Sequence, residues 1–225
     1  LNPNCKKTIG YRDADPWSMQ YFLDSNASLS KLPFVRVSRP GVYGSSGVHG
    51  SRMLFREIQI MDAALDTIKK KHKIDKLSIS GQSGGGHVVT SLITLRNDVV
   101  CAVSSSGAVA VRKRVFAKGW NRDITGYSNY FDPIDHIDQI SAAEGFRFFL
   151  LGDPKDSNAP FSIQKAYLKK ENDSGLDATL IEFHGSGSQN HGLEQAAITV
   201  STLCALNTST EEILERAKTG YILLC

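Results

Sequence analysis

The sequence predicts an α/β protein in which a mostly parallel sheet is flanked by helices. Short apolar runs typical of buried strands alternate with longer segments whose apolar residues recur every three or four positions. This alternation is typical of parallel strands with helices on both faces of the sheet. A Gly-x-Ser-x-Gly pattern lies between one such run and the following helix. The 225 residues, 41% of them hydrophobic, are enough to bury one full core, so we expect a single domain over residues 1–225.

The expected elements follow one another in a regular order. The first is a strand at 32–38, which Arg39-Pro40-Gly41 would end. A long helix at 51–73 follows, with one apolar stripe formed by Leu54, Ile58, Met61, Leu65 and Ile68. Further strands are expected at 77–80, 99–103, 146–151 and 178–183, with helices at about 84–95, 160–170 and 193–206. Thr208 and Glu211 form a candidate capping box for a last helix that Gly220 would end.

The segment at about 111–140 interrupts this order. Its periodicity is weak, and its aromatic residues are scattered among Gly, Asn and Asp. We expect an irregular insertion over the carboxyl edge of the sheet, where it would form part of a substrate pocket.

Charge and hydropathy exclude some classes of function. The net charge is +3, and the basic residues cluster at 69–73 and 112–114. Neither cluster contains interleaved aromatic residues for base stacking, so we interpret both as solvated helix ends or loops rather than a nucleic-acid site. No apolar run approaches the roughly 20 residues of a membrane span, and no signal peptide is visible.

The four cysteines predict no metal site. Cys5, Cys101, Cys204 and Cys225 are widely spaced and match no ligand pattern. Cys101 lies in an apolar strand and Cys204 in an apolar helix, where cysteine usually acts as a small hydrophobic residue. This usage favours a reducing, cytoplasmic compartment, with a mature secreted form as the alternative. We expect no metal and no organic cofactor.

The Gly81-Gln82-Ser83-Gly84-Gly85 segment is the strongest chemical signal. It follows an apolar strand and precedes a helix, which is the context of a nucleophile elbow. In such a turn the serine adopts strained backbone angles, and small neighbours let the strand and helix pass close together. The alternative interpretation is an ordinary glycine-rich turn between a strand and a helix.

A serine nucleophile needs a histidine as base and an acid to orient it. In an elbow of this kind the acid and then the histidine follow the serine along the chain. Asp153 and Asp156 come after the strand at 146–151, and His184 and His191 come after the strand at 178–183. Two aspartates and two histidines therefore compete for the two roles.

At these motifs the sequence resembles the α/β-hydrolase superfamily, particularly its dienelactone-hydrolase and prolyl-oligopeptidase-like branches. Residues 156–160 (Asp-Ser-Asn-Ala-Pro) resemble the Asp-x-x-Val-Pro segment of those families, with alanine in place of valine and one extra spacer residue before it. The His191-Gly192 pair is similar to the His-Gly pair that opens their last helix. The resemblance, which covers residues 32–206, favours Asp156 over Asp153 and His191 over His184.

The resemblance also implies a departure at the N-terminal side. The family's sheet begins with three further strands, and the loop after the third supplies one amide of the oxyanion hole. Those strands are short or missing in this sequence. The Gly84 amide is the expected donor on the serine side, and the second donor is expected near Asn4.

These patterns predict a serine hydrolase that acts on a small-molecule ester or acyl substrate. Ser83 would attack, His191 would carry the proton, and Asp156 would hold the imidazole. An ester is favoured over an amide, because the chain has no propeller-like gating domain. A peptidase or acyltransferase with the same triad is one alternative, and a non-catalytic binding module is the other.

Overall fold

The computed structural model describes residues 20–218. The chain divides after Arg52 into two compact units. The first contains α1 (Gln20–Ser30) and the short 3-10 helix η2 (His49–Ser51), and the second contains the sheet. The expectation of a single domain over residues 1–225 reaches beyond the described residues and stays a prediction.

Residues 32–38 form no strand, so the strand predicted there is wrong. More and less exposed residues alternate along this segment, and Val35 is 53% exposed. The alternation fits an extended backbone, but no other described segment pairs with it in a ladder. Pro33 also lacks an N–H to donate. An alternating pattern of exposure therefore indicates an extended backbone. A β-strand also needs a neighbouring strand to which it can hydrogen-bond.

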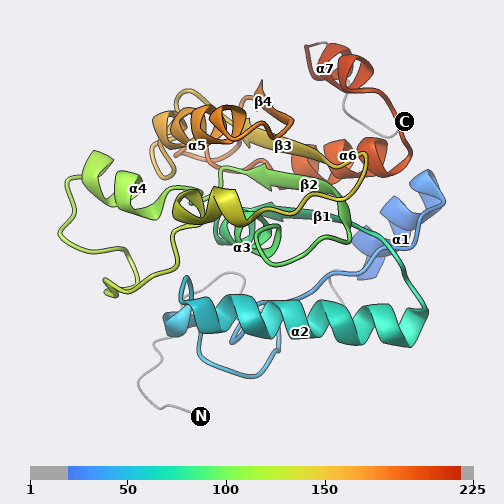
Figure 1. Cartoon of the computed structure of the whole chain (residues 1–225), viewed down its shortest axis with the longest axis horizontal. Coiled ribbons are helices and arrows are strands. Elements are labelled where there is room, and N and C mark those ends of the chain that lie inside the picture. The colour runs from blue at the N-terminus through green and yellow to red at the C-terminus, as the bar shows by residue number, and fades with distance from the viewer. Residues whose placement is uncertain (1–19, 219–225) are drawn as a thin grey trace. The chain divides into compact units, whose positions relative to one another are not determined.

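The sheet of the second unit contains four parallel strands in the order β1-β2-β3-β4 among the described residues (Figure 1). The strands are β1 (Leu77–Gln82), β2 (Val99–Ser105), β3 (Arg147–Gly152) and β4 (Ala178–Glu182). The four strands predicted after residue 76 are thus confirmed, with ends that differ by no more than two residues. Since all four run parallel, their carboxyl ends meet at one edge of the sheet.

Helices cover both faces of this sheet. The helices of this unit are α2 (Phe55–His72), α3 (Gly84–Leu92), α4 (Val111–Ala117), the 3-10 helix η3 (Pro133–Gln139), α5 (Phe161–Asp173), α6 (Glu194–Ala205) and α7 (Thr210–Lys218). Of these, α3, α5 and α6 pack directly on the strands. Ala102 belongs to a core cluster with side chains of α3, η3 and α5. Its neighbour Cys101 points to the other face, where α6 packs on β1 and β2. The α2 helix contacts α3 and lies outside it (Figure 1).

Two helix starts differ from the predictions. The helix expected from residue 51 begins at Phe55, because Met53 has a positive φ of 66° and its N–H donates to the Glu57 carboxylate at 2.7 Å. The last helix begins at Thr210, and the Ser209 hydroxyl, rather than Thr208, accepts the Glu212 N–H at 3.2 Å. The predicted end at Gly220 lies outside the described residues.

Cys101 and Cys204 form a disulfide that joins β2 to α6, so their interpretation as unbonded hydrophobic residues is wrong. Their Cα atoms lie 6.1 Å apart although 103 residues separate them in sequence. Each side chain is buried, which is why the local pattern around each resembles ordinary core. Disulfides persist in oxidising compartments, so cysteine usage no longer favours a reducing one.

Two short helices, α4 and η3, lie within the segment 111–140. The Asp132 carboxylate accepts the N–H groups of Val111 and Arg112 at 2.8 and 2.9 Å and thereby fixes the start of α4 to the start of η3. Burial raises the pKa of Asp132, although these two N–H groups act in the opposite direction. No helix within residues 20–218 has both the length and the apolar character needed to cross a membrane.

Candidate catalytic site

Ser83 occupies a tight turn between β1 and α3. Its backbone has φ 57° and ψ −116°, a positive-φ conformation outside the commonly allowed regions that costs free energy for a residue with a side chain. Two hydrogen bonds hold it, from the Ser83 N–H to the Ser105 carbonyl at 2.8 Å and from the His87 N–H to the Ser83 carbonyl at 3.1 Å. A Cβ at Gly81 would collide with the Gly85 carbonyl. The turn therefore needs glycine beside the serine for a steric reason.

The loop after β4 presents His191. Ser186 and Gly192 form an antiparallel bridge across its base, and the His191 N–H donates to the Ser186 carbonyl at 3.2 Å. A Cβ at Gly185 would overlap the Asn190 carbonyl, so the loop closes tightly only with glycine there. The glycines that the sequence places around His191 therefore allow a compact turn that fixes the direction of the imidazole.

The loop after β3 presents Asp156, whose carboxylate accepts three hydrogen bonds. One oxygen accepts the N–H groups of Asn158 and Ala159 at 2.7 and 2.9 Å, and the other lies 2.8 Å from Nδ1 of His191. The side chain is only 1% exposed. Burial alone would raise the pKa of Asp156, but the His191 bond and the two backbone bonds lower it below its usual value. The carboxylate is thus kept ionised beside the imidazole.

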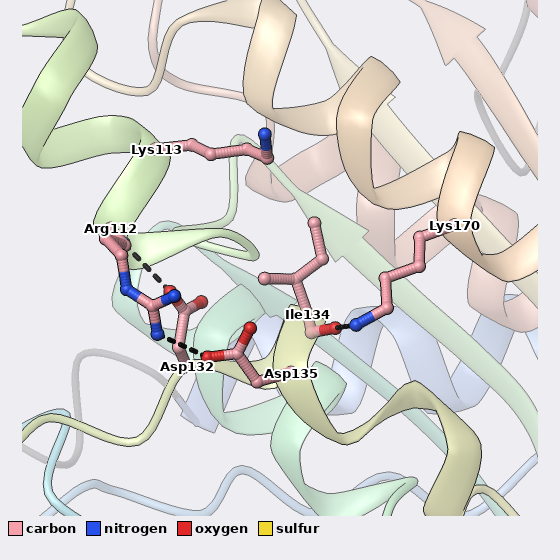
Figure 2. Close-up of a pocket in the computed structure, with 6 residues that line it drawn as sticks. All are labelled: Arg112, Lys113, Asp132, Ile134, Asp135 and Lys170. Atoms are coloured by element: carbon pink, nitrogen blue, oxygen red, sulfur yellow. Dashed lines mark hydrogen bonds and ion pairs between the residues drawn. The ribbon is translucent and has the colours of Figure 1, made fainter.

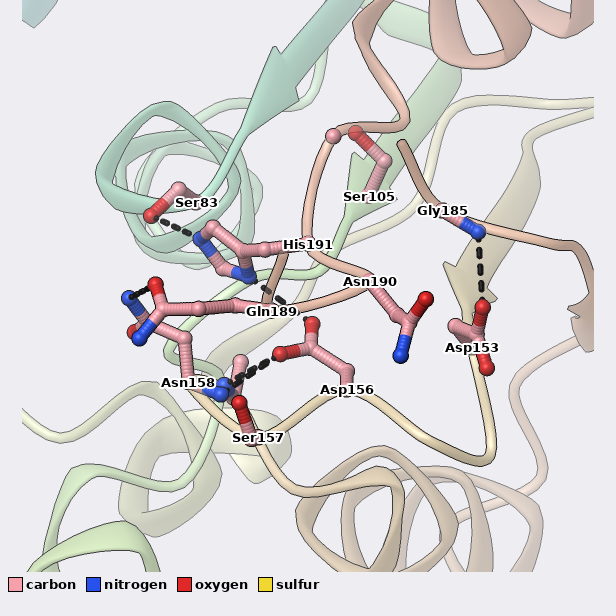
Figure 3. Close-up of polar contacts among 12 residues, drawn as sticks. Ser83, Ser105, Asp153, Asp156, Ser157, Asn158, Gly185, Gln189, Asn190 and His191 are labelled. Atoms are coloured by element: carbon pink, nitrogen blue, oxygen red, sulfur yellow. Dashed lines mark hydrogen bonds and ion pairs between the residues drawn. The ribbon is translucent and has the colours of Figure 1, made fainter. Parts of the chain in front are cut away.

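Ser83, His191 and Asp156 form one continuous chain of hydrogen bonds (Figure 3). The Ser83 Oγ lies 2.8 Å from Nε2 of His191. With the Asp156 carboxylate as acceptor, Nδ1 carries the proton and Nε2 is free to accept the serine proton. This arrangement is able to remove a proton from the hydroxyl and stabilise the resulting imidazolium.

The two competing side chains lie elsewhere. Asp153 is buried, and its carboxylate accepts the N–H groups of Lys155 and Gly185, each at 2.7 Å. It therefore joins the loop after β3 to the loop after β4 (Figure 3). His184 is exposed and forms no hydrogen bond with any described group. Of the four candidates, only Asp156 and His191 reach Ser83 as a connected chain.

Of the two expected oxyanion donors, one lies in the described chain. Gly84 is the first residue of α3, where an amide has no partner within its own helix, and none of residues 20–218 accepts its N–H. This amide is adjacent to Ser83 and is able to donate to an oxygen atom there. Asn4 lies outside the described residues. No group of three or more His, Cys, Asp or Glu side chains able to hold a metal ion occurs in the described part of the chain.

Sequence reasoning missed a support of His191. The Gln82 side chain donates from Nε2 to the His191 carbonyl at 2.8 Å and so links the residue before the serine to the histidine loop. The Gly-x-Ser-x-Gly pattern leaves this position open, so no signal in the motif identifies it.

A small polar cavity of about 230 Å³ lies outside this group of side chains (Figure 2). Its lining comes from α4, η3 and α5, with Arg112 paired to Asp135 at 2.5 Å and Lys170 donating to the Ile134 carbonyl at 2.6 Å. These contacts occupy two of its cations with neighbouring acceptors, and Asp132 at its wall binds the start of α4. The contacts around the cavity thus hold α4, η3 and α5 together.

Solved structures with a similar fold occur at low sequence identity. Est1E from Butyrivibrio proteoclasticus, in a structure with bound ferulic acid, is 15% identical with a TM-score of 0.62, and the match covers 89% of this chain and 85% of that one. The acylaminoacyl peptidase of Pyrococcus horikoshii is 16% identical with a TM-score of 0.55 over 80% of this chain. The match spans only 30% of that peptidase. No family model and no curated protein matches the sequence.

The architecture and these likenesses agree. The described unit has a parallel sheet covered on both faces, and its first strand leads through the turn at Ser83 into a helix. Loops after the third and fourth strands carry Asp156 and His191 at the carboxyl edge. The solved structures named above are similar in fold to this chain over 80% or more of its length. The chain has the α/β-hydrolase fold.

Proposed function

We propose that this protein is a serine hydrolase that cleaves a carboxylic ester through an acyl-enzyme. The observation that carries the proposal is the unbroken chain from Ser83 Oγ through both nitrogens of His191 to the Asp156 carboxylate, with 2.8 Å at each link. A serine hydroxyl is a weak nucleophile until a positioned base takes its proton, and this geometry supplies that base.

In the first half of the reaction, Ser83 Oγ bonds to the carbonyl carbon of the ester while its proton passes to Nε2 of His191. The carbonyl oxygen becomes an oxyanion, and the Gly84 N–H donates to it. The tetrahedral intermediate then expels the alcohol, which takes the proton from Nε2, and the acyl group remains on Ser83. Asp156 accepts from Nδ1 throughout and stabilises the imidazolium without taking its proton.

In the second half, water replaces the alcohol. Nε2 of His191 takes one proton from the water, whose oxygen bonds to the acyl carbon. The second tetrahedral intermediate collapses, the proton returns to Ser83 Oγ, and the carboxylic acid leaves. Removing one oxyanion donor typically costs about 10²–10³ in rate, so the Gly84 amide has a large share in both halves.

An ester is the favoured substrate among the acyl compounds that this chemistry handles. Est1E, whose structure contains ferulic acid, matches this chain over 85% of its own length, whereas the peptidase match spans 30%. A carboxylic acid is the product expected from an ester. Cleavage of an amide and acyl transfer to an alcohol use the same acyl-enzyme and are the alternatives.

Covalent labelling by a fluorophosphonate tests the proposal. The wild-type protein should react with one equivalent of probe, located on Ser83 by mass spectrometry, and Ser83→Ala should abolish labelling. Ser188→Ala is a matched control, because Ser188 is an exposed serine in the His191 loop and should change nothing. Comparison of a p-nitrophenyl ester with the matching anilide then separates esterase from amidase. An unlabelled wild-type protein, or labelling that survives Ser83→Ala, would refute the proposal.

A further inference from the structure

Side chains of α4 and of the residue that follows it donate hydrogen bonds to the loop that carries Asp156. Arg114 of α4 is 5% exposed, and its guanidinium donates twice to a single residue of that loop. Its Nη2 lies 2.6 Å from the Asn158 side-chain oxygen, and its Nε lies 3.0 Å from the Asn158 carbonyl. One turn later, Lys118 donates to the Ser157 carbonyl at 2.6 Å.

The residue held by Arg114 is the one that holds the acid. The Asn158 N–H donates to Asp156 Oδ1 at 2.7 Å, and the next amide, of Ala159, donates to the same oxygen at 2.9 Å. The other oxygen, Oδ2, receives Nδ1 of His191. We call the two donors of Arg114 that bind Asn158, Nε and Nη2, the Arg114 fork. By holding Asn158, the fork limits the movement of the backbone N–H groups that orient the Asp156 carboxylate.

Arg114 is itself fixed by the insertion. Asp123 is buried and lies 3.5 Å from Nη1, and its other oxygen accepts the Thr125 N–H at 2.9 Å. The Trp120 ring lies 5.1 Å from the guanidinium carbon, a distance typical of a cation–π contact. Burying a guanidinium is costly unless it is paired and hydrogen-bonded. These groups supply that pairing and leave the fork aimed at Asn158.

We propose that Arg114 is a positioning residue for Asp156, and that its bonds to Asn158, together with the Lys118 bond to Ser157, hold the acid loop in its active geometry. This inference rests on the proposed function for its effect on rate. It also makes a prediction about the loop that does not depend on activity. The guanidinium is almost fully buried and is hydrogen-bonded to the acid loop, so its removal should lower kcat and leave KM unchanged.

The test compares Arg114→Met with Arg112→Met. Arg112 lies on the same helix, but it is exposed and pairs with Asp135 rather than with the acid loop. For Arg114→Met, kcat on an activated ester should fall between about tenfold and a hundredfold, because a small misplacement of a catalytic group has effects of that size. The acid limb of the kcat/KM profile should move to lower pH, since the imidazolium loses an aligned carboxylate. The kcat and the acid limb of Arg114→Lys should lie between those of wild type and Arg114→Met. Both quantities should be unchanged in Arg112→Met.

Amide hydrogen exchange gives the readout that is independent of catalysis. In Arg114→Met, the Asn158 and Ala159 amides should exchange faster, while amides of β2 and β3 keep their rates. Asn158→Ala is the second variant, to be used if Arg114→Met does not fold. It removes the side-chain oxygen that accepts from Arg114 Nη2, and Asn158 is only half-buried. It should release the Ala159 amide in the same way.

Two results would overturn the inference. One is a kcat and an acid limb for Arg114→Met equal to those of Arg112→Met. The other is exchange that rises uniformly through the protein, which indicates lost stability rather than a loosened loop. If the fluorophosphonate fails to label the wild type, the proposed function fails, and the exchange comparison still decides whether Arg114 holds the acid loop.

Discussion

Replacing Glu171 by glutamine should stabilise the protein at neutral pH. Glu171 lies on the inner face of α5 and is 0% exposed. Neither carboxyl oxygen has a hydrogen-bond partner among the described residues, and the hydroxyl of Tyr167, one turn earlier, is also without one. Burial raises the pKa of Glu171 from 4.5 to about 9. The folded protein therefore keeps this carboxyl protonated at neutral pH, whereas the unfolded chain ionises it.

The size of the effect follows from linkage. Below pH 4.5 both states are protonated, and the group does not change the free energy of unfolding. Above that pH only the unfolded state loses the proton, so the folded state is destabilised by about 1.4 kcal/mol for each pH unit. The cost is about 3 kcal/mol at pH 7 and levels off near 6 kcal/mol once the folded group ionises above pH 9. Glutamine is neutral at every pH and has no such cost.

Urea denaturation at pH 5, 6, 7 and 8 measures this difference. The free energy of unfolding of Glu171→Gln minus that of wild type should grow by about 4 kcal/mol between pH 5 and pH 8. Glu144→Gln, at an exposed glutamate, is the control and should give a difference that varies little with pH. Parallel stability curves for Glu171→Gln and wild type would refute the reasoning, since they would mean that the carboxyl is ionised and paired in the folded state.

Two further predictions concern the acid and the disulfide. Asp156→Asn should lower kcat by about 10⁴, whereas Asp153→Asn should lower mainly stability, because Asp153 binds the backbone of Gly185. Similar losses of kcat in both variants would contradict the assignment. The double variant Cys101→Ala, Cys204→Ala should lose about 2–5 kcal/mol of stability, as seen in its urea midpoint. Its kcat should be retained, because Cys101 forms the first pair of β2 with β3, four pairs before the pair at the carboxyl edge. A large loss of kcat without loss of stability would refute this.

The parts of the fold predicted well are those determined by local pattern. Four strands were placed to within two residues because runs of apolar residues between turn formers have few other structures available. The turn at Ser83 was identified from the glycines around it, and at Gly81 the glycine is required sterically, because a Cβ there would meet the Gly85 carbonyl. His191 was favoured over His184 because the His191-Gly192 pair resembles the His-Gly pair of the hydrolase families, and the structure shows that its tight loop needs glycine at Gly185.

The parts predicted wrongly depend on partners distant in sequence. The segment 32–38 alternates like a strand, but pairing is decided elsewhere in the chain. Cys101 and Cys204 resemble core residues locally, and only the packing of α6 on β2 brings them together. The pair of bonds from Arg114 to Asn158 joins α4 to the loop after β3 across 44 residues of sequence, so no periodicity signals it. Hydrogen bonds between polar groups far apart in sequence do not change the spacing of apolar residues, so that spacing cannot predict them.

Each member of the proposed triad is held by backbone bonds from a different part of the chain. Ser83 is fixed through the Ser105 carbonyl of β2, His191 through the carbonyl of Ser186, and Asp156 through the amides that follow it. The three reacting groups therefore reach their geometry before any substrate arrives, and substrate binding does not have to supply the energy to align them. It follows that a change in one of these supports, such as loss of the Gln82 bond to His191, should act on kcat more than on KM. Changes in residues that contact only the substrate should act on KM more than on kcat. Measuring both constants for each variant therefore separates residues that align the reacting groups from residues that line the pocket.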